Sequence, residues 1–257
     1  MFEDPDRRRL FLLRHAEAAY IRDDGSVAPD VRVVGLTADG RVQARCHRDV
    51  LAAVPFDRAV CSGLERTRET ASILLEGRDK PTLEVVPALE EVRGGERRTE
   101  VPDPAAWIRH IANPWATAAE TDARFLGGER FRDLEARVLG AFDELIADAS
   151  WRNLLVVAHG GVNRVIMNRV MNTPWQAGVS IEQDACCINI VDLDMKDRRV
   201  ARFLVRALNI TGYNLNKVGI RLTDMERTAE RVAGLIAGAR PPPLAPRTSG
   251  KESDWGA

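Results

Sequence analysis

Two short apolar runs that end in histidine constrain the fold of this chain most. Leu10–Leu13 is followed directly by Arg14 and His15, and Leu154–Ala158 is followed by His159 and two glycines. Short unbroken apolar runs predict strands that are buried on both faces, as in the middle of a mostly parallel sheet. Ligands of open α/β sheets bind just beyond the carboxyl ends of the strands. A single apolar run followed by polar residues is explained equally well by a strand that ends in solvent. Two runs that each end in a histidine favour a binding site.

The rest of the chain alternates strand and helix patterns. Strands are expected at residues 58–62 and 83–87, and helices at residues 37–54, 64–75, 103–113, 131–146, 161–171 and 223–237. Two further strands, at residues 185–193 and 200–208, flank a polar turn and predict an antiparallel hairpin. This alternation indicates βαβ units. We expect an α/β fold, a three-layer α/β/α sandwich with a mostly parallel central sheet and an antiparallel edge hairpin near the C-terminus.

The first helix illustrates how its boundaries and buried face are inferred. Thr37 is a favourable N-cap residue, and Pro55 cannot continue a helix. Apolar side chains recur at four-residue intervals and predict one buried stripe. The stripe consists of Val42, Cys46, Val50 and Val54.

Composition excludes several classes of protein. The 257 residues are 45% hydrophobic and carry a formal net charge of −1, which argues against a dedicated nucleic-acid or membrane-surface protein. No apolar stretch approaches the ~20 residues that span a bilayer. The N-terminus is acidic where a secretory signal is basic. The four cysteines lack the spacing of a disulfide framework or a metal site, and Cys186–Cys187 is expected within a packed strand. We therefore expect a cytoplasmic protein.

Polar residues that suit phosphoryl chemistry are expected at the strand ends. They are Arg14, His15, Arg66, the pair Glu90–Glu91, His159 and Gly160. Arginine binds phosphate oxygens in a bidentate manner, and a helix N-terminus favours an anion. A neutral imidazole can carry a phosphoryl group covalently, and a carboxylic acid can protonate a leaving oxygen.

These residues resemble the motifs of the histidine phosphatase superfamily, the phosphoglycerate-mutase-like group. The four similar segments are Leu13–Glu17, Cys61–Ala71, Leu89–Val92 and Val157–Gly161. They occur in the family's order and at family-like spacing, and the resemblance covers residues 9–210. It implies a phosphoglycerate mutase-like fold and an enzyme of the phosphatase branch.

The resemblance also implies roles for single residues. His15 is expected to be the phosphohistidine nucleophile, and Glu91 the general acid and base, with Glu90 left open as the alternative. His159 is expected to be catalytic and, with Arg14, Arg66 and Gly160, to hold the phosphoryl group. The resemblance implies no metal and no organic cofactor. Arg68, His47 and His110 lack motif positions and are expected at the surface.

The substrate is less constrained than the chemistry. Many family members have a threonine and an asparagine where this chain has Ala18 and Ile21, which weakens a mutase interpretation. The irregular segment 93–128 is expected to be a cap that sets specificity. Candidates for substrate contacts are Tyr20, Arg97, Arg98 and Arg109, although the arginines are explained equally well as a solvated surface.

Three functions remain. The favoured one is a metal-independent phosphatase that hydrolyses a small phosphomonoester. The others are a phosphoglycerate-mutase-type phosphotransferase and a non-catalytic binding protein on the same fold. We expect one domain over residues 1–238 and a disordered Pro-rich tail over residues 239–257. The expected partner is a small phosphorylated molecule, without nucleic acid or membrane, and the oligomeric state is open between a monomer and a homodimer.

Overall fold

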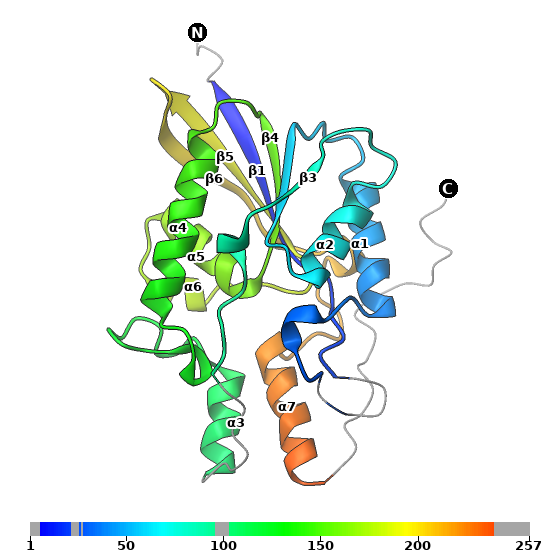
Figure 1. Cartoon of the computed structure of the whole chain (residues 1–257), viewed down its shortest axis with the longest axis vertical. Helices are drawn as coiled ribbons and strands as arrows, with labels where there is room; N and C mark the ends of the chain where they lie inside the picture. Colours follow the sequence, from blue (N-terminus) through cyan, green and yellow to red (C-terminus); the bar gives the residue numbers. More distant parts are fainter. Residues whose placement is uncertain (1–5, 22–25, 27, 96–102, 239–257) are drawn as a thin grey trace.

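A six-stranded sheet forms the centre of the molecule. The computed structural model describes residues 6–21, 26, 28–95 and 103–238 (Figure 1). The strand order is β3-β2-β4-β1-β5-β6. The strands are β1 (Arg7–Arg14), β2 (Arg58–Cys61), β3 (Leu83–Val85), β4 (Asn153–Ala158), β5 (Ile188–Lys196) and β6 (Arg199–Ile210). The first four are parallel, whereas β5 pairs antiparallel with both β1 and β6. The expected α/β fold with an antiparallel edge hairpin is confirmed.

Helices cover both faces of the sheet. They are α1 (Ala38–Val50), α2 (Glu65–Leu74), α3 (Pro104–Ala112), α4 (Phe131–Ala147), α5 (Gly160–Met171), α6 (Trp175–Val179) and α7 (Asp224–Ile236). The α1–α2 pair lies on one face and the group α4, α5 and α6 on the other (Figure 1). The five-residue helix α6 is not among the helices expected from the sequence.

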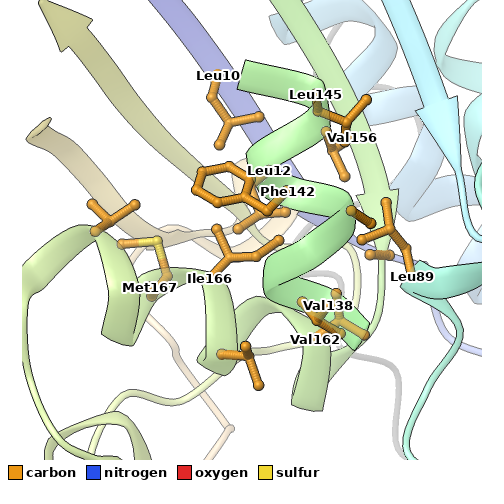
Figure 2. Packing of buried hydrophobic residues seen from close by; sticks show 14 of the residues in the cluster. Leu10, Leu12, Leu89, Val138, Phe142, Leu145, Val156, Val162, Ile166 and Met167 are labelled. Carbon is orange, nitrogen blue, oxygen red and sulfur yellow. The ribbon is translucent and has the colours of Figure 1, made fainter. Parts of the chain in front are cut away.

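The central strands have apolar side chains on both faces because each face is covered. Leu10 and Leu12 of β1 pack with α4 and α5, where Phe142 and Ile166 are buried (Figure 2). Phe11 points the other way, into the cluster beneath α1 and α2. The alternation along one strand explains why β1 has no polar position between Arg9 and Arg14.

The buried face of α1 differs from the expected one. Thr37 caps the helix as expected, accepting a hydrogen bond from the Gly40 backbone N–H. The buried side chains include Gln43 and His47, however, whereas Val50 is 56% exposed. A Cβ on Gly40 would lie 2.2 Å from the carbonyl oxygen of Glu17, so the close approach of these backbones sets the rotation of the helix. The expectation that His47 lies at the surface is wrong.

The boundaries of the edge hairpin also differ from expectation. Cys186 and Cys187 are fully buried, but they precede β5 instead of belonging to it. Cys186 has a φ of 58°, in the left-handed region, which is incompatible with a strand. Its backbone N–H donates to the carbonyl of His15, so the turn closes against the end of β1.

Helices α3 and α7 extend together beyond the carboxyl edge of the sheet. They lie side by side (Figure 1), although α3 belongs to the expected insert and α7 follows the last strand. A capping box begins α7, in which Thr223 and Glu226 satisfy each other's backbone N–H groups. This pair of helices therefore lies on the side of the sheet where the motif residues end their strands.

Candidate active site

The motif residues converge at the carboxyl ends of neighbouring strands. His15 follows β1 and His159 follows β4, and these strands are paired in parallel up to Arg14 and Ala158. The two imidazole ring centroids are 5.2 Å apart. Both histidines are buried, with exposed fractions of 2% and 0%. Arg66 from α2 and Glu91 from the segment after β3 complete the group.

His15 is held in a defined tautomer. Its Nδ1 atom lies 2.7 Å from the carbonyl oxygen of Ala16, which can only accept, so Nδ1 carries the proton. Nε2 then presents a lone pair and faces the hydroxyl of Tyr20 at 3.4 Å. Burial, followed by the charges of Arg66 and Arg14, lowers the pKa of His15 well below its ordinary value. The ring is therefore neutral near pH 7, which is the form that can act as a nucleophile.

His159 is bound to a serine of the second motif. The Ser62 Oγ atom lies 2.8 Å from Nε2 of His159 and 3.0 Å from Oγ1 of Thr67. Thr67 itself donates to the carbonyl oxygen of Leu64. Nδ1 of His159 is buried and has no partner among the residues that the structure describes. The sequence expectations gave Ser62 no role, although its position in the second motif was a signal.

The two motif arginines each use one nitrogen for a fixed contact. Nη1 of Arg14 donates to the carbonyl oxygen of Gln183 and to Asp224, and Nη1 of Arg66 donates to the carbonyl oxygen of Val31. Their Nε atoms are buried and lack a partner within the described part of the chain. Burial alone lowers the pKa of Arg14, but the Asp224 carboxylate raises it above its ordinary value. Both side chains can therefore still donate to an anion.

Glu91 and Glu90 point to different partners. Both carboxylate oxygens of Glu91 lie 3.2 Å from the backbone nitrogen of Gly161, in the first turn of α5. Glu90 instead accepts a hydrogen bond from Arg32 at 2.7 Å. Arg137 of α4 donates to the carbonyl oxygens of Ala88 and Glu90, each at 2.7 Å, and so holds this segment. Glu91 is therefore the glutamate that lies at the site.

A buried arginine and a half-buried glutamate, neither of them identified from the sequence, flank this group. Arg164 of α5 packs over the ring of Trp115 at 5.1 Å and donates to Glu182 at 3.3 Å. Burial lowers the pKa of Arg164, and it raises the pKa of Glu182. Arg164 lies one helical turn after Gly160, a spacing that brings its side chain back to the start of the helix.

Other candidates from the sequence lie elsewhere. Arg68 is exposed, as expected, and donates to the carbonyl oxygen of Gly63. Arg109 is exposed on α3, and His110 is half-buried beside Trp107. Arg97 and Arg98 lie outside the described residues, as does the expected tail 239–257.

The described residues contain neither a metal-binding cluster of side chains nor a helix that could span a membrane. No group of three or more His, Cys, Asp or Glu side chains is arranged to hold a metal ion in this part of the chain. Within the same residues, no helix has the length and apolar character needed to cross a membrane.

Comparison with known proteins agrees with this geometry. The model of the histidine phosphatase superfamily (branch 1) matches residues 10–206. The chain is 30% identical over 198 residues to the adenosylcobalamin/alpha-ribazole phosphatase of Salmonella typhimurium, covering 72% of this chain and 90% of that protein. It is also 30% identical over 159 residues to a 2,3-bisphosphoglycerate-dependent phosphoglycerate mutase 2 of Gloeobacter violaceus, covering 60% of this chain and 72% of the mutase.

Solved structures show the same fold. The alpha-ribazole phosphatase from Shigella flexneri superimposes with a TM-score of 0.62 at 27% identity, covering 78% of this chain and 96% of that one. The matched family region includes all four motifs and both histidine-bearing strands, and it ends before α7. The chain therefore belongs to branch 1 of the histidine phosphatase superfamily and is a phosphatase of that family.

Proposed function

We propose that this protein is a metal-independent phosphatase that hydrolyses a small phosphomonoester through a phosphohistidine intermediate on His15. The observation that carries the proposal is the hydrogen bond from Nδ1 of His15 to the Ala16 carbonyl. It leaves the Nε2 lone pair available in a buried site with two arginine side chains. Such a neutral imidazole beside fixed cations suits attack on an electrophilic phosphorus.

The proposed reaction has two displacement steps. Arg14, Arg66 and His159 hold the phosphoryl oxygens at the start of α5, where Gly160 opens the helix. Nε2 of His15 attacks phosphorus while the bond to the alcohol oxygen breaks, and Glu91 gives its proton to that oxygen. Glu91 then takes a proton from water, whose oxygen attacks phosphorus and releases phosphate from His15. Every proton and bond is accounted for by the chain, the ester and one water.

The substrate proposal comes from the relatives. Several are named adenosylcobalamin/alpha-ribazole phosphatases, so alpha-ribazole 5′-phosphate is the first substrate to test. The similarity to a phosphoglycerate mutase supports phosphotransfer as the second candidate. A cytoplasmic location and the lack of nucleic-acid partners stay predictions from the sequence, and the choice between a monomer and a homodimer stays open.

The test is phosphate release from a panel of phosphomonoesters in EDTA by the wild type and His15→Ala. The panel includes alpha-ribazole 5′-phosphate and p-nitrophenyl phosphate. We expect release by the wild type and none by the variant, whose thermal unfolding should show an intact fold. Release by a folded His15→Ala variant would contradict the proposal. Interconversion of phosphoglycerates without phosphate release would favour the mutase.

A further inference from the structure

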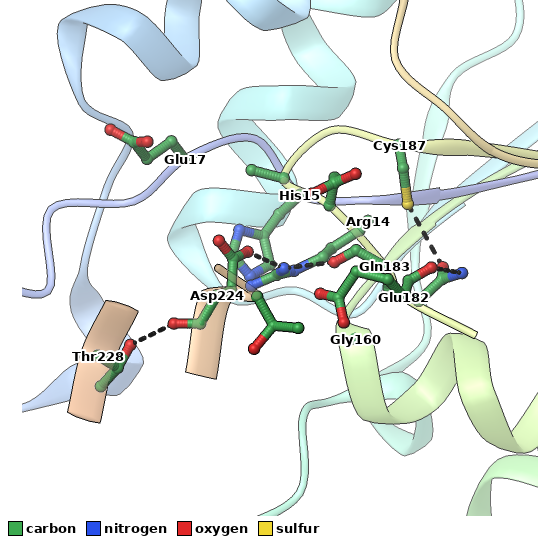
Figure 3. A network of polar contacts seen from close by, with 12 residues as sticks. Arg14, His15, Glu17, Gly160, Glu182, Gln183, Cys187, Asp224 and Thr228 are labelled. Atoms are coloured by element: carbon green, nitrogen blue, oxygen red, sulfur yellow. Dashed lines mark hydrogen bonds and ion pairs between the residues drawn. The ribbon is translucent and has the colours of Figure 1, made fainter. Parts of the chain in front are cut away.

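Helix α7 supplies a carboxylate to the site from beyond the four motifs. Asp224, the first residue of α7, accepts a hydrogen bond from Nη1 of Arg14 (Figure 3). The side chains of Arg14 and Asp224 are only 16% and 19% exposed. This contact joins the end of β1 to a helix that lies outside the matched family region. Asp224 is therefore a feature of this chain's site that the motifs do not account for.

Asp224 and a phosphoryl group can use different edges of the same guanidinium. Nη1 of Arg14 is occupied by Asp224 and by the Gln183 carbonyl. Nε is buried without a partner among the described residues, and it lies 3.7 Å from the position that a Cβ on Gly160 would take. The free edge thus faces the start of α5, which favours an anion. Asp224 can remain on Arg14 while a phosphoryl group binds.

The negative charge of Asp224 influences Tyr20, which lies next to His15. Burial raises the pKa of Tyr20, and the negative charges of Glu91 and Asp224 also raise it. The positive charges of Arg66 and Arg14 lower the same pKa. The Tyr20 hydroxyl is the group that lies 3.4 Å from Nε2 of His15. A ligand that contacts the Tyr20 hydroxyl therefore lies within reach of the charge of Asp224.

Two arginines of the site are already paired with carboxylates. Arg14 is paired with Asp224, and Arg164 is paired with Glu182. Glu91 adds a third carboxyl group beside Gly161. A phosphoryl group uses the remaining donors of Arg14 and Arg66, so an additional carboxylate placed beside Arg14 would meet the Asp224 carboxylate. Like charges placed together in a partly buried site are strongly unfavourable.

We propose that Asp224 is a specificity-determining residue that restricts the enzyme to phosphomonoesters whose alcohol carries no second anionic group. Alcohols with additional hydroxyl groups are favoured, because a hydroxyl can donate to the carboxylate. The inference rests on the proposed function and names the substrate class of the same site.

The test compares two esters that differ at one group. Glycerol 3-phosphate carries a CH₂OH group where 3-phosphoglycerate carries a carboxylate. We expect the wild type to have the higher kcat/KM for glycerol 3-phosphate. Asp224→Asn should raise kcat/KM for 3-phosphoglycerate relative to glycerol 3-phosphate by about tenfold. Inhibition of p-nitrophenyl phosphate hydrolysis by the two esters gives the same comparison without requiring their turnover.

Three further variants separate charge from structure. Asp224→Glu keeps the charge and should keep the wild-type ratio. Glu230→Gln removes one negative charge from an exposed position of the same helix and should also keep the wild-type ratio of kcat/KM values. Asp224→Ser is a second neutral variant that retains a small polar side chain if the asparagine variant does not fold.

The outcomes distinguish this inference from the proposed function. An active neutral variant with the wild-type ratio would overturn the role of Asp224 and leave the phosphatase proposal standing. A wild type that prefers 3-phosphoglycerate would overturn it as well. A folded wild type that hydrolyses no ester, including p-nitrophenyl phosphate, would contradict the proposed function and the inference with it.

Discussion

The Oγ atom of Ser62 lies 2.8 Å from Nε2 of His159, and both side chains are fully buried. Thr67 donates its own proton to the Leu64 carbonyl, so Oγ1 of Thr67 and Nε2 of His159 are both possible acceptors for the single proton of Ser62. In the tautomer that binds a phosphoryl oxygen through Nδ1, Ser62 donates to Nε2 of His159. Donation to Nε2 places the ring proton on Nδ1, the buried atom without a partner in the described residues. His159 is then a neutral hydrogen-bond donor to a phosphoryl oxygen. Ser62 is a positioning residue in this account, since it acts through His159.

Replacing Ser62 tests this arrangement. Ser62→Ala should lower kcat about tenfold, the equivalent of one hydrogen bond, because His159 loses the partner that sets its tautomer. Ser62→Thr restores a hydroxyl and should recover most of the rate. Steady-state kinetics over a range of pH measures the effect. Equal losses in the alanine and threonine variants would show that packing, and not the hydroxyl, is what matters.

Glu91 is expected to matter most for poor leaving groups. Glu91→Gln cannot protonate the departing oxygen, so it should slow alkyl phosphates far more than p-nitrophenyl phosphate, whose leaving group needs little protonation. Glu90→Gln is the matched control, because Glu90 pairs with Arg32. The ratio of the two rates in each variant is the readout. An equal loss on both ester types in Glu91→Gln would argue against a role as the acid.

Replacing each of two arginines of α2 should affect activity to very different extents. Arg66 is 3% exposed at the site, whereas Arg68 is exposed and points to the Gly63 carbonyl. Arg66→Ala should lower kcat/KM by about 10- to 100-fold, because charge-assisted hydrogen bonds to phosphate are lost. Arg68→Ala removes the same charge from the same helix and should change little. Competitive inhibition by inorganic phosphate checks the binding contribution, and comparable effects of the two variants would contradict the assignment.

His47 makes the fold sensitive to acid. Burial lowers its pKa from the ordinary 6.5 to about 4, and its Nε2 accepts a hydrogen bond from Gly212 at 2.6 Å. Below pH 6.5 the unfolded chain binds a proton at His47 that the folded chain excludes, so the free energy of unfolding falls as the pH is lowered toward 4. The loss from this group is up to about 3 kcal/mol.

His47→Gln isolates that effect. Glutamine offers an acceptor to Gly212 but does not titrate, so the variant should lose less stability over the same pH window. Urea unfolding of both proteins across the window gives the difference between them. His15 and His159 are present in both proteins, so their contributions to the pH dependence of the free energy of unfolding cancel in this comparison. Parallel pH curves for the wild type and the variant would contradict the lowered pKa of His47.

The core of the fold and most of the site were predictable because they depend on local patterns. An apolar run without a polar break, such as Leu10–Leu13, requires burial on both faces, and two such runs belong at the centre of one sheet. Because both runs end at the same edge of that sheet, His15 and His159 lie close together. The order of the motifs indicated Arg66 and the Glu90–Glu91 pair, and the family match covers the segments that contain them.

What could not be predicted depends on contacts between distant segments. The position of Glu91 beside Gly161 depends on a segment that Arg137 of α4 holds through the Ala88 and Glu90 carbonyls. Asp224 reaches Arg14 across 210 residues of sequence. The rotation of α1 depends on the approach of Gly40 to the Glu17 backbone, which a four-residue apolar spacing cannot reveal. The proposed domain boundaries stay a prediction.

Trapping the phosphoryl-enzyme tests the central claim most directly. Glu91→Gln should accumulate the intermediate with p-nitrophenyl phosphate, because formation needs no acid whereas hydrolysis needs the base. The reaction is quenched with alkali, which preserves phosphohistidine, and the digested peptides are analysed by mass spectrometry. We predict one phosphoryl group on His15. Steady phosphate release with a phosphoryl group on another residue, or on none, would contradict the account.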